Sequence, residues 1–97
     1  MPNYVVLFNW TDQGIKNFKD SPSRVDAATT EMEKVGVRIT NIQWTLGPYD
    51  LVALVEAPDD ESLTAALLAL GSAGNVRSTT LRAFGRDEFE QVIQKGG

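Results

Sequence analysis

The stretch that decides the fold is ITNIQWTLGPYDLVALVEA, residues Ile39 to Ala57. Gly47-Pro48-Tyr49-Asp50 in its middle is a turn sequence, because the proline ring holds φ near the value required at the first corner of a turn. The flanking runs, Ile39–Leu46 and Leu51–Ala57, are rich in the apolar, β-branched and aromatic residues that favour strands. The stretch therefore predicts a β-hairpin with a four-residue turn.

Counting outward from that turn predicts which residues face each other. Because side chains alternate between the two faces of a strand, the predicted pairs fall into two rows. One row is apolar and is assigned to the side that helices cover: Leu46 with Leu51, Trp44 with Ala53, and Ile42 with Val55. The other row is mixed: Thr45 with Val52, Gln43 with Leu54, and Asn41 with Glu56.

The rest of the chain supplies two more strands and two longer helices. Turn, cap and periodicity signals predict, in chain order, a strand at Tyr4–Trp10, a short helical turn capped by Thr11 or Asp12, a helix from Ser21-Pro22 to Gly36, a helix from Asp59 to Gly71, a strand at Asn75–Phe84 and a short helix at Asp87–Gln94. This βαββαβ order with right-handed crossovers predicts an α+β, ferredoxin-like domain over residues 1–97. Its four-stranded antiparallel sheet carries both longer helices on one face.

The other face of that sheet is expected to need a cover of its own. The first strand is apolar in both rows, with Tyr4, Val6, Phe8 and Trp10 on one side and Val5 and Leu7 on the other. Two helices cover only one face of such a sheet. The remaining apolar groups predict a homodimer in which two sheets pack face to face and enclose a cavity.

Composition excludes several classes of chemistry. The 97 residues include no Cys and no His, so a disulfide, a thiolate nucleophile, a Cys/His zinc site and an imidazole base are all absent. No metal and no cofactor are predicted. The net charge of −4 disfavours nucleic acid as a partner, since an acidic chain repels phosphates. No apolar run is long enough for a membrane span and no leader is recognisable, so we expect a cytoplasmic protein without a membrane partner.

Tyr49 and Asp50 are the first candidate site residues. In a functional interpretation, Asp50 is an acceptor and Tyr49 a donor or stacking surface at the mouth of a cavity. In a structural one, Asp50 accepts a hydrogen bond that closes the turn and Tyr49 packs on it. The structural interpretation is favoured.

Arg82 and Glu56 are expected on the same sheet face, towards the cavity between subunits. They could bind the charged groups of a small ligand, or pair with each other or across the dimer; the second role is favoured because buried charges are seldom left unpaired. Asn9, Asn41 and Gln43 would line the same space as neutral hydrogen-bonding groups.

Other polar or aromatic features have structural explanations. Asp12 fits a helix cap better than a metal ligand paired with Glu56, and Asp59-Asp60-Glu61 complements a helix dipole. Gly71–Asn75 follows a helix and lacks the lysine of a phosphate-binding loop. Trp10 and Trp44 are interpreted as core or cavity wall, because the basic surround of a base-stacking surface is missing.

Several separated segments resemble the GYD domain family. They are Trp10–Lys16, Gly47-x-Tyr49-Asp50, Glu56–Asp60, Gly71-Ser72-x-Gly74-Asn75-Val76-Arg77, Thr79–Leu81 and Ala83-Phe84. The resemblance extends over nearly the whole chain. It implies a dimeric α+β barrel from a family whose members are generally bacterial or archaeal and of unassigned function, so it implies no catalytic residues.

Three functions remain open from the sequence. The first is a homo-oligomeric module that binds a small organic molecule in the cavity between the sheets. The second is a small enzyme without a cofactor, oxygenase- or isomerase-like, in which Tyr49, Asn41 and Arg82 stabilise an oxyanion. The third is a purely structural adaptor oligomer. The binding module ranks first.

Overall fold

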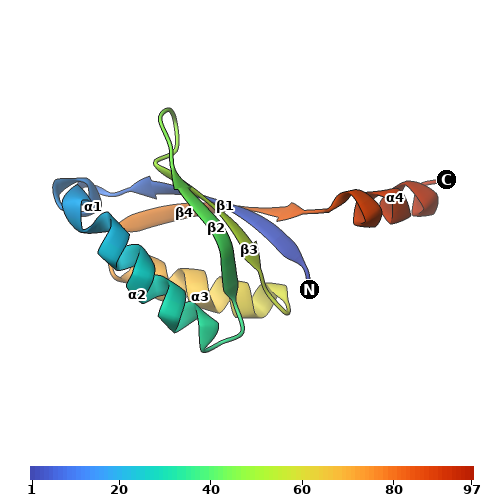
Figure 1. Ribbon diagram of the computed structural model, residues 1–97, viewed down its shortest axis with the longest axis horizontal. Coiled ribbons are helices and arrows are strands. Elements are labelled where there is room, and N and C mark those ends of the chain that lie inside the picture. The colour runs from blue at the N-terminus through green and yellow to red at the C-terminus, as the bar shows by residue number, and fades with distance from the viewer.

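The computed structural model describes all residues 1–97 and has the predicted element order (Figure 1). The elements are β1 (Asn3–Trp10), α1 (Asp12–Lys16), the 3₁₀ turn η1 (Phe18–Asp20), α2 (Ser21–Glu33), β2 (Arg38–Trp44), β3 (Leu51–Glu56), α3 (Asp60–Ser72), β4 (Val76–Ala83) and α4 (Arg86–Lys95). The four strands form one antiparallel sheet in the order β2-β3-β1-β4. The predicted α+β, ferredoxin-like fold is confirmed.

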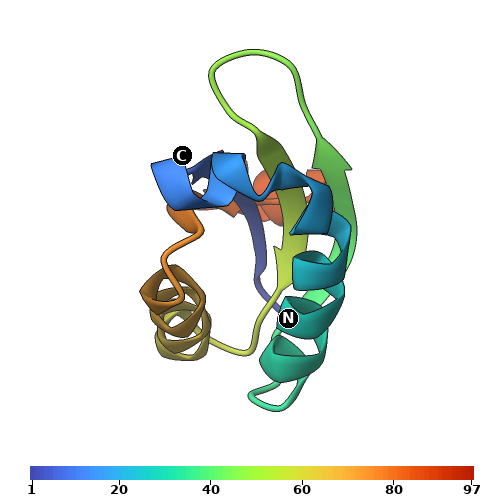
Figure 2. The same cartoon turned by 90° about the vertical axis from the view of Figure 1, so that its left-hand side faces the viewer.

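Helices α2 and α3 lie on the same face of this sheet, and α4 extends away from its end (Figures 1 and 2). The core lies between the sheet and these two helices. It is built from alternate residues of β1 and β3 with a few side chains of the helices and loops: Tyr4, Val6, Phe8, Leu51, Ala53, Val55, Met32, Val37, Ala57, Leu63 and Ala66. None of the helices is both long and apolar enough to cross a membrane.

The hairpin turn lies one residue earlier than predicted. The backbone N–H of Thr45 donates to Asp50 O at 2.9 Å, so the four residues between this pair, Leu46–Tyr49, make the turn. Asp50 precedes β3 and is bound to β1, because its own N–H donates to Phe8 O at 2.8 Å. The predicted pairing is therefore wrong by two residues: the observed pairs are Trp44–Leu51, Ile42–Ala53, Gln43–Val52 and Asn41–Leu54, with an irregularity between Ile39 and Asn41.

A shift of two residues leaves the side chains of Asn41–Trp44 and Leu51–Glu56 on their predicted faces. Leu46, predicted in the apolar row opposite Leu51, instead lies in the turn and is fully exposed. Ile42, Trp44, Leu51, Ala53 and Val55 share the face that α2 and α3 cover. The opposite face, called the open face below, holds the alternate residues of all four strands: Asn3, Val5, Leu7 and Asn9 of β1, Arg38, Asn41 and Gln43 of β2, Val52, Leu54 and Glu56 of β3, and Arg77, Thr79, Leu81 and Ala83 of β4.

The helix ends follow the predicted capping chemistry with two corrections. Thr11, not Asp12, caps α1 by accepting from Gly14 N–H. Asp59 caps α3 by accepting from the N–H of Ser62 at 2.7 Å. Ser21 is the first residue of α2 and not its cap, so Pro22 occupies the second helical position.

Candidate functional site

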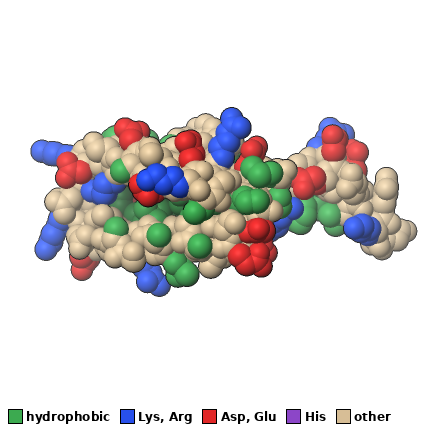
Figure 3. Space-filling model, turned by 90° about the horizontal axis from the view of Figure 1, so that it is seen from below, with side chains coloured by type: hydrophobic (Ala, Val, Ile, Leu, Met, Phe, Trp, Pro, Cys, Tyr) green, Lys and Arg blue, Asp and Glu red, His purple; other side chains and the backbone are tan.

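A cleft with a volume of about 610 Å³ lies between α2, α3 and the sheet. Of its 21 lining residues, 16 are hydrophobic. Figure 3 looks onto this side of the molecule and shows a recess with hydrophobic side chains at its floor. Small-molecule sites are typically mostly apolar clefts of about 300–1,000 Å³ with a few polar groups, so this cleft has the size and lining of a ligand site.

Helices α2 and α3 lie apart, as Figure 2 shows, and many of the side chains that line the cleft between them are small. Six of the lining residues are alanines: Ala27 and Ala28 on α2, and Ala65, Ala66, Ala69 and Ala73 in or next to α3. Larger side chains of the sheet, including Phe8, Ile42 and Leu51, form the floor. Alanine side chains are too short to meet across the gap, so apolar surface stays accessible to a ligand.

One polar group in the cleft wall has no partner. Trp10, at the end of β1, lines the cleft, and its indole Nε1 is buried without a hydrogen-bond acceptor. The other tryptophan differs, because Trp44 Nε1 donates to Ser21 Oγ at 3.0 Å. A buried donor left unpaired costs about 1–3 kcal/mol. Nε1 itself is not exposed in the cleft, so a ligand oxygen would remove that cost only once neighbouring side chains move aside.

Arg24 of α2 also lines the cleft. Its Nη1 donates to Asn17 O at 2.7 Å and its Nη2 to Gly14 O at 3.3 Å, which fixes the side chain against the end of α1. A guanidinium has five N–H donors, so donors remain for an anionic group. Farther along α2, Glu31 and Lys34 form an exposed ion pair of 2.9 Å.

The cleft therefore offers a mostly apolar lining with a few polar side chains: Arg24 and Lys34 are donors, Glu31 is an acceptor, and Ser21 and Asn75 can be either. Such a lining can hold an apolar molecule that carries a carboxylate or carbonyl oxygen. No group of three acidic, His or Cys side chains is placed to hold a metal ion. The sequence indicated Trp10 only as core or cavity wall, the expected cavity being the one between two sheets, and it did not reveal this cleft.

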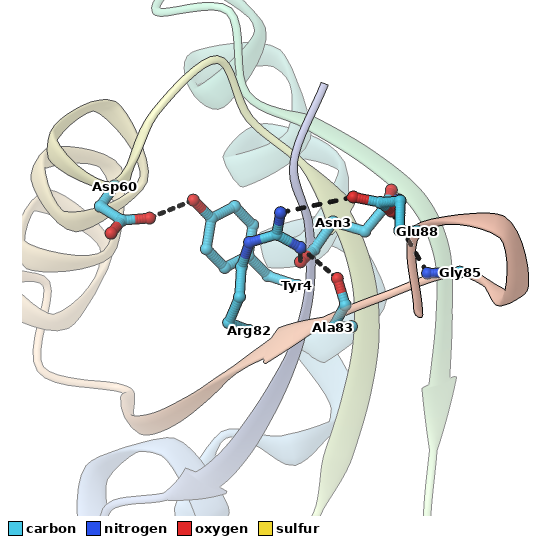
Figure 4. Close-up of polar contacts among 7 residues, drawn as sticks. All are labelled: Asn3, Tyr4, Asp60, Arg82, Ala83, Gly85 and Glu88. Atoms are coloured by element: carbon cyan, nitrogen blue, oxygen red, sulfur yellow. Dashed lines mark hydrogen bonds and ion pairs between the residues drawn. The ribbon is translucent and has the colours of Figure 1, made fainter. Parts of the chain in front are cut away.

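A second polar cluster lies beyond the far end of the cleft, where α3 begins and α4 leaves the sheet (Figure 4). The hydroxyl of Tyr4 donates to the Asp60 carboxylate. This hydrogen bond, together with burial of the ring and the negative charge of Asp60, raises the pKa of the Tyr4 phenol. Arg82 lies 5.6 Å from the centre of the Tyr4 ring.

Glu88 of α4 joins the same cluster. Its Oε1 accepts from the backbone N–H of Gly85 at 3.2 Å, and its Oε2 lies 3.5 Å from Nη2 of Arg82. The hydrogen bond from the Gly85 N–H, and to a smaller extent the contact with Arg82, holds the pKa of Glu88 below its ordinary value. Arg82 also donates to the backbone oxygens of Asn3 and Ala83. Its contacts tie the start of α4 to the sheet.

The expected placement of Arg82 is wrong. Arg82 pairs with Tyr4 in the sheet, so it lies on the face covered by helices, whereas Glu56 lies on the open face beside Asn3 and Arg38. The two do not form a pair. Asn41 also lies on the open face and Tyr49 lies in the turn, so the suggested oxyanion group of Tyr49, Asn41 and Arg82 does not converge.

Asn9 and Asp50 fasten the hairpin turn to β1. Asp50 Oδ2 accepts from the backbone N–H of Trp10 at 2.8 Å, and Asn9 Nδ2 donates to Pro48 O at 2.7 Å. The turn is closed by Thr45 Oγ1, which donates to Tyr49 O at 2.6 Å. These contacts agree with the structural interpretation of Asp50.

Asn41, Gln43 and Glu56 share the open face, as predicted. Asn41 and Gln43 are exposed and stand beside Leu54 and Val52 of the neighbouring strand. The cavity predicted between two sheets would require a second copy of the chain and stays a prediction.

Comparison with known proteins identifies relatives along nearly the whole chain. The family model of the GYD domain matches residues 4–93. The glutamine synthetase and cystathionine β-lyase binding protein of Thermus thermophilus is 39% identical over 84 residues, which are 86% of this chain and 88% of the relative.

Solved structures support the same fold. A crystal structure of a protein from Thermus thermophilus matches with a TM-score of 0.57 and 29% identity, covering 88% of this chain and 95% of the other. The leucine response regulatory protein of Mycobacterium tuberculosis has a TM-score of 0.59 and 20% identity; 89% of this chain matches 54% of that one, so that likeness concerns the fold alone. By its sequence and its fold, this chain belongs to the GYD domain family.

Proposed function

We propose that this protein is a homo-oligomeric binding protein that takes a small apolar molecule bearing a carboxylate or carbonyl oxygen. The single observation that carries the proposal is the apolar cleft of about 610 Å³ with an unpartnered Trp10 Nε1 in its wall. The apolar body would lie between the alanines of α2 and α3. Its oxygen would accept from Trp10 Nε1, with Arg24 as a further donor.

This proposal moves the ligand from the position that the sequence suggested. A cavity between two sheets would be lined by Asn41, Gln43 and Glu56, and it depends on a dimer. The α2–α3 cleft is present within one chain, and one of its lining residues, Trp10, has a buried indole N–H without an acceptor. The geometry therefore favours the cleft.

The self-association in the proposal rests on the open face. Leu54 and Leu81 are 46% and 49% exposed there, and they flank Val5 of β1. Contiguous exposed apolar side chains mark interaction sites more often than free surface. A second copy offers the same row, so two open faces can cover each other. We place this dimer in the cytoplasm, with which a chain free of cysteine is compatible.

The ligand proposal is tested with a panel of aliphatic and aromatic carboxylates and their matched alcohols. Binding is followed by thermal shift and by Trp10 fluorescence in a Trp44→Phe background, where Trp10 is the sole tryptophan. A ligand at about 100 times its Kd should stabilise the protein by about 2.7 kcal/mol. Trp10→Phe keeps the ring but removes the donor, so it should weaken binding about 3- to 10-fold.

Two substitutions by phenylalanine, one inside the cleft and one outside it, form a matched test and control. Ala69→Phe puts a ring into the cleft and should abolish binding, whereas Leu68→Phe, at a position 70% exposed and outside the lining, should leave it unchanged. Binding that survives Ala69→Phe would place the ligand elsewhere and refute the proposal.

A second candidate function is an adaptor that binds enzymes. It is favoured by the relative from Thermus thermophilus, which is described as binding glutamine synthetase and cystathionine β-lyase. Titration of each of these two enzymes with this protein, followed by calorimetry, tests it. Heat of binding that is unchanged by Ala69→Phe would support an adaptor acting through another surface.

A further inference from the structure

Helix α4 does not belong to the compact part of the molecule. It extends beyond the end of the sheet (Figure 1), and the chain measures 50 Å along its longest axis. The radius of gyration is 14.5 Å, against about 12.5 Å for a compact chain of this length. No residue of α4 is part of the core or packs against it.

The helix nevertheless has one apolar side. Phe89, Val92 and Ile93 fall on it, and they are 52%, 42% and 58% exposed. The polar tie between α4 and the sheet is Glu88, which contacts Arg82 and Asn3. An isolated helix of this length is marginal in water, and most helices are stabilised by packing of their apolar side. The apolar side of α4 therefore needs a partner.

We infer that α4 is an exchange arm whose apolar side packs against a second copy of this chain. The inference rests on the proposed self-association through the open face. It adds that the dimer is completed by two reciprocal arms, each contributed by one subunit to the other.

The area of the open face argues for this occupant. Four strands of about seven residues make a footprint of about 450 Å². A stable interface usually buries about 800 Å² per partner. An arm of ten residues is about 15 Å long and 10 Å wide. Each subunit therefore adds about 150 Å² of contact area on its own arm and a similar area where its partner's arm covers its surface. Two arms bring the footprint close to what a stable dimer needs.

The position of α4 fits the same partner. It follows the end of β4, where the last row of the open face is Ala83–Asn3–Glu56 and the next row inward is the apolar row Leu81–Val5–Leu54. When the open faces of two copies meet, each arm starts at the edge of the interface and can continue it along the other subunit. A two-fold dimer then covers both arms at once.

The test compares charged substitutions on the two sides of α4. Ile93→Asp and Phe89→Asp place a carboxylate on the apolar side, while Gln91→Asp places one on the opposite side with the same change of charge. Sedimentation equilibrium of the full chain measures the dimer dissociation constant. Each substitution acts in both arms of the dimer. We therefore expect the dimer dissociation constant to rise at least about 100-fold for Ile93→Asp and Phe89→Asp, and to stay within about 3-fold of the wild-type value for Gln91→Asp.

Further measurements separate the possible failures. All three positions are exposed in one subunit, so melting curves at low concentration should show that each variant folds. Leu54→Asp tests the open face by itself. A wild-type dimer that Leu54→Asp dissociates but Ile93→Asp and Phe89→Asp leave intact would overturn the arm and retain the sheet interface. A wild-type protein that is a monomer at about 100 μM would overturn both the sheet interface and the arm. The ligand proposal does not depend on that result, because binding in the cleft is measured in a separate experiment.

Discussion

Replacing Asp50 tests whether the residue that gives the family its turn signature holds the fold together. Asp50→Ala removes the carboxylate that accepts from the Trp10 N–H at 2.8 Å, and the N–H is then left in a partly buried place without an acceptor. A hydrogen bond to a charged group contributes about 1.5–3 kcal/mol, and an unpaired buried donor costs a similar amount. We expect the free energy of unfolding to fall by about 2 kcal/mol.

Urea denaturation and thermal melting measure this loss. For a domain of about 100 residues, 1 kcal/mol shifts Tm by about 4–8 °C, so Asp50→Ala should lower Tm by about 8–16 °C. Asp50→Asn keeps an acceptor oxygen and should lose about half as much. Tyr49→Phe is the neighbouring control, because the Tyr49 hydroxyl takes part in no hydrogen bond, and it should change stability by less than about 0.5 kcal/mol. An Asp50→Ala variant that melts like the wild type would refute this account of the turn.

Three further predictions concern backbone packing and pH. Gly14→Ala should destabilise the protein by about 3 kcal/mol in urea denaturation, because an added Cβ would lie 2.0 Å from Asn75 O, whereas Gly85→Ala, with its nearest neighbour at 3.8 Å, should be neutral. The phenol of Tyr4 should titrate above its ordinary pKa of 10.0 in an ultraviolet absorbance titration, and Asp60→Asn should bring the pKa back towards that value. Because its folded-state pKa is raised, the stability that Tyr4 contributes is complete below pH about 10 and is lost as pH rises through the folded value. The pKa of Glu88 is lowered, so its contribution is complete above the unfolded value of about 4 and is lost as pH falls through the folded one; Glu88→Gln should therefore make stability less dependent on pH between about 5 and 3.

The strand faces could be predicted from the sequence because they depend only on alternation. Ala53 and Val55 are buried in the row where counting placed them, although the turn was placed one residue too late. That error arose because Asp50 reads as a turn residue, while its hydrogen bonds to Phe8 and Trp10 bind it to β1. Those bonds join residues about forty positions apart, so local turn chemistry does not reveal them.

The face of Arg82 could not be predicted in the same way. Within β4, polar residues occur in both rows, and only the pairing of Tyr4 with Arg82 decides which row lies on the helix side. Pairing between strands of distant sequence is not encoded in either strand alone. Cation–π contacts of Arg82 with Tyr4 and Phe84 then hold the charged side chain at the edge of the core.

The cleft was missed because periodicity shows which side of a helix faces the sheet but not how far apart two helices lie. The signal was the run of alanines, including Ala27 and Ala28 on α2 and Ala65 and Ala69 on α3. Alanine on a buried helix side is compatible with close helix packing as well as with an open cleft. The structure distinguishes the two by the volume that remains accessible.

The most direct test of the central claim is a ¹H–¹⁵N spectrum of the two indole N–H groups, recorded while a carboxylate that stabilises the protein is added. Trp44 serves as an internal reference, because its N–H already donates to Ser21. We predict that the Trp10 N–H resonance moves downfield as it gains an acceptor, while the Trp44 resonance stays in place. Saturating binding with an unmoved Trp10 resonance would contradict a ligand held in the cleft by that donor.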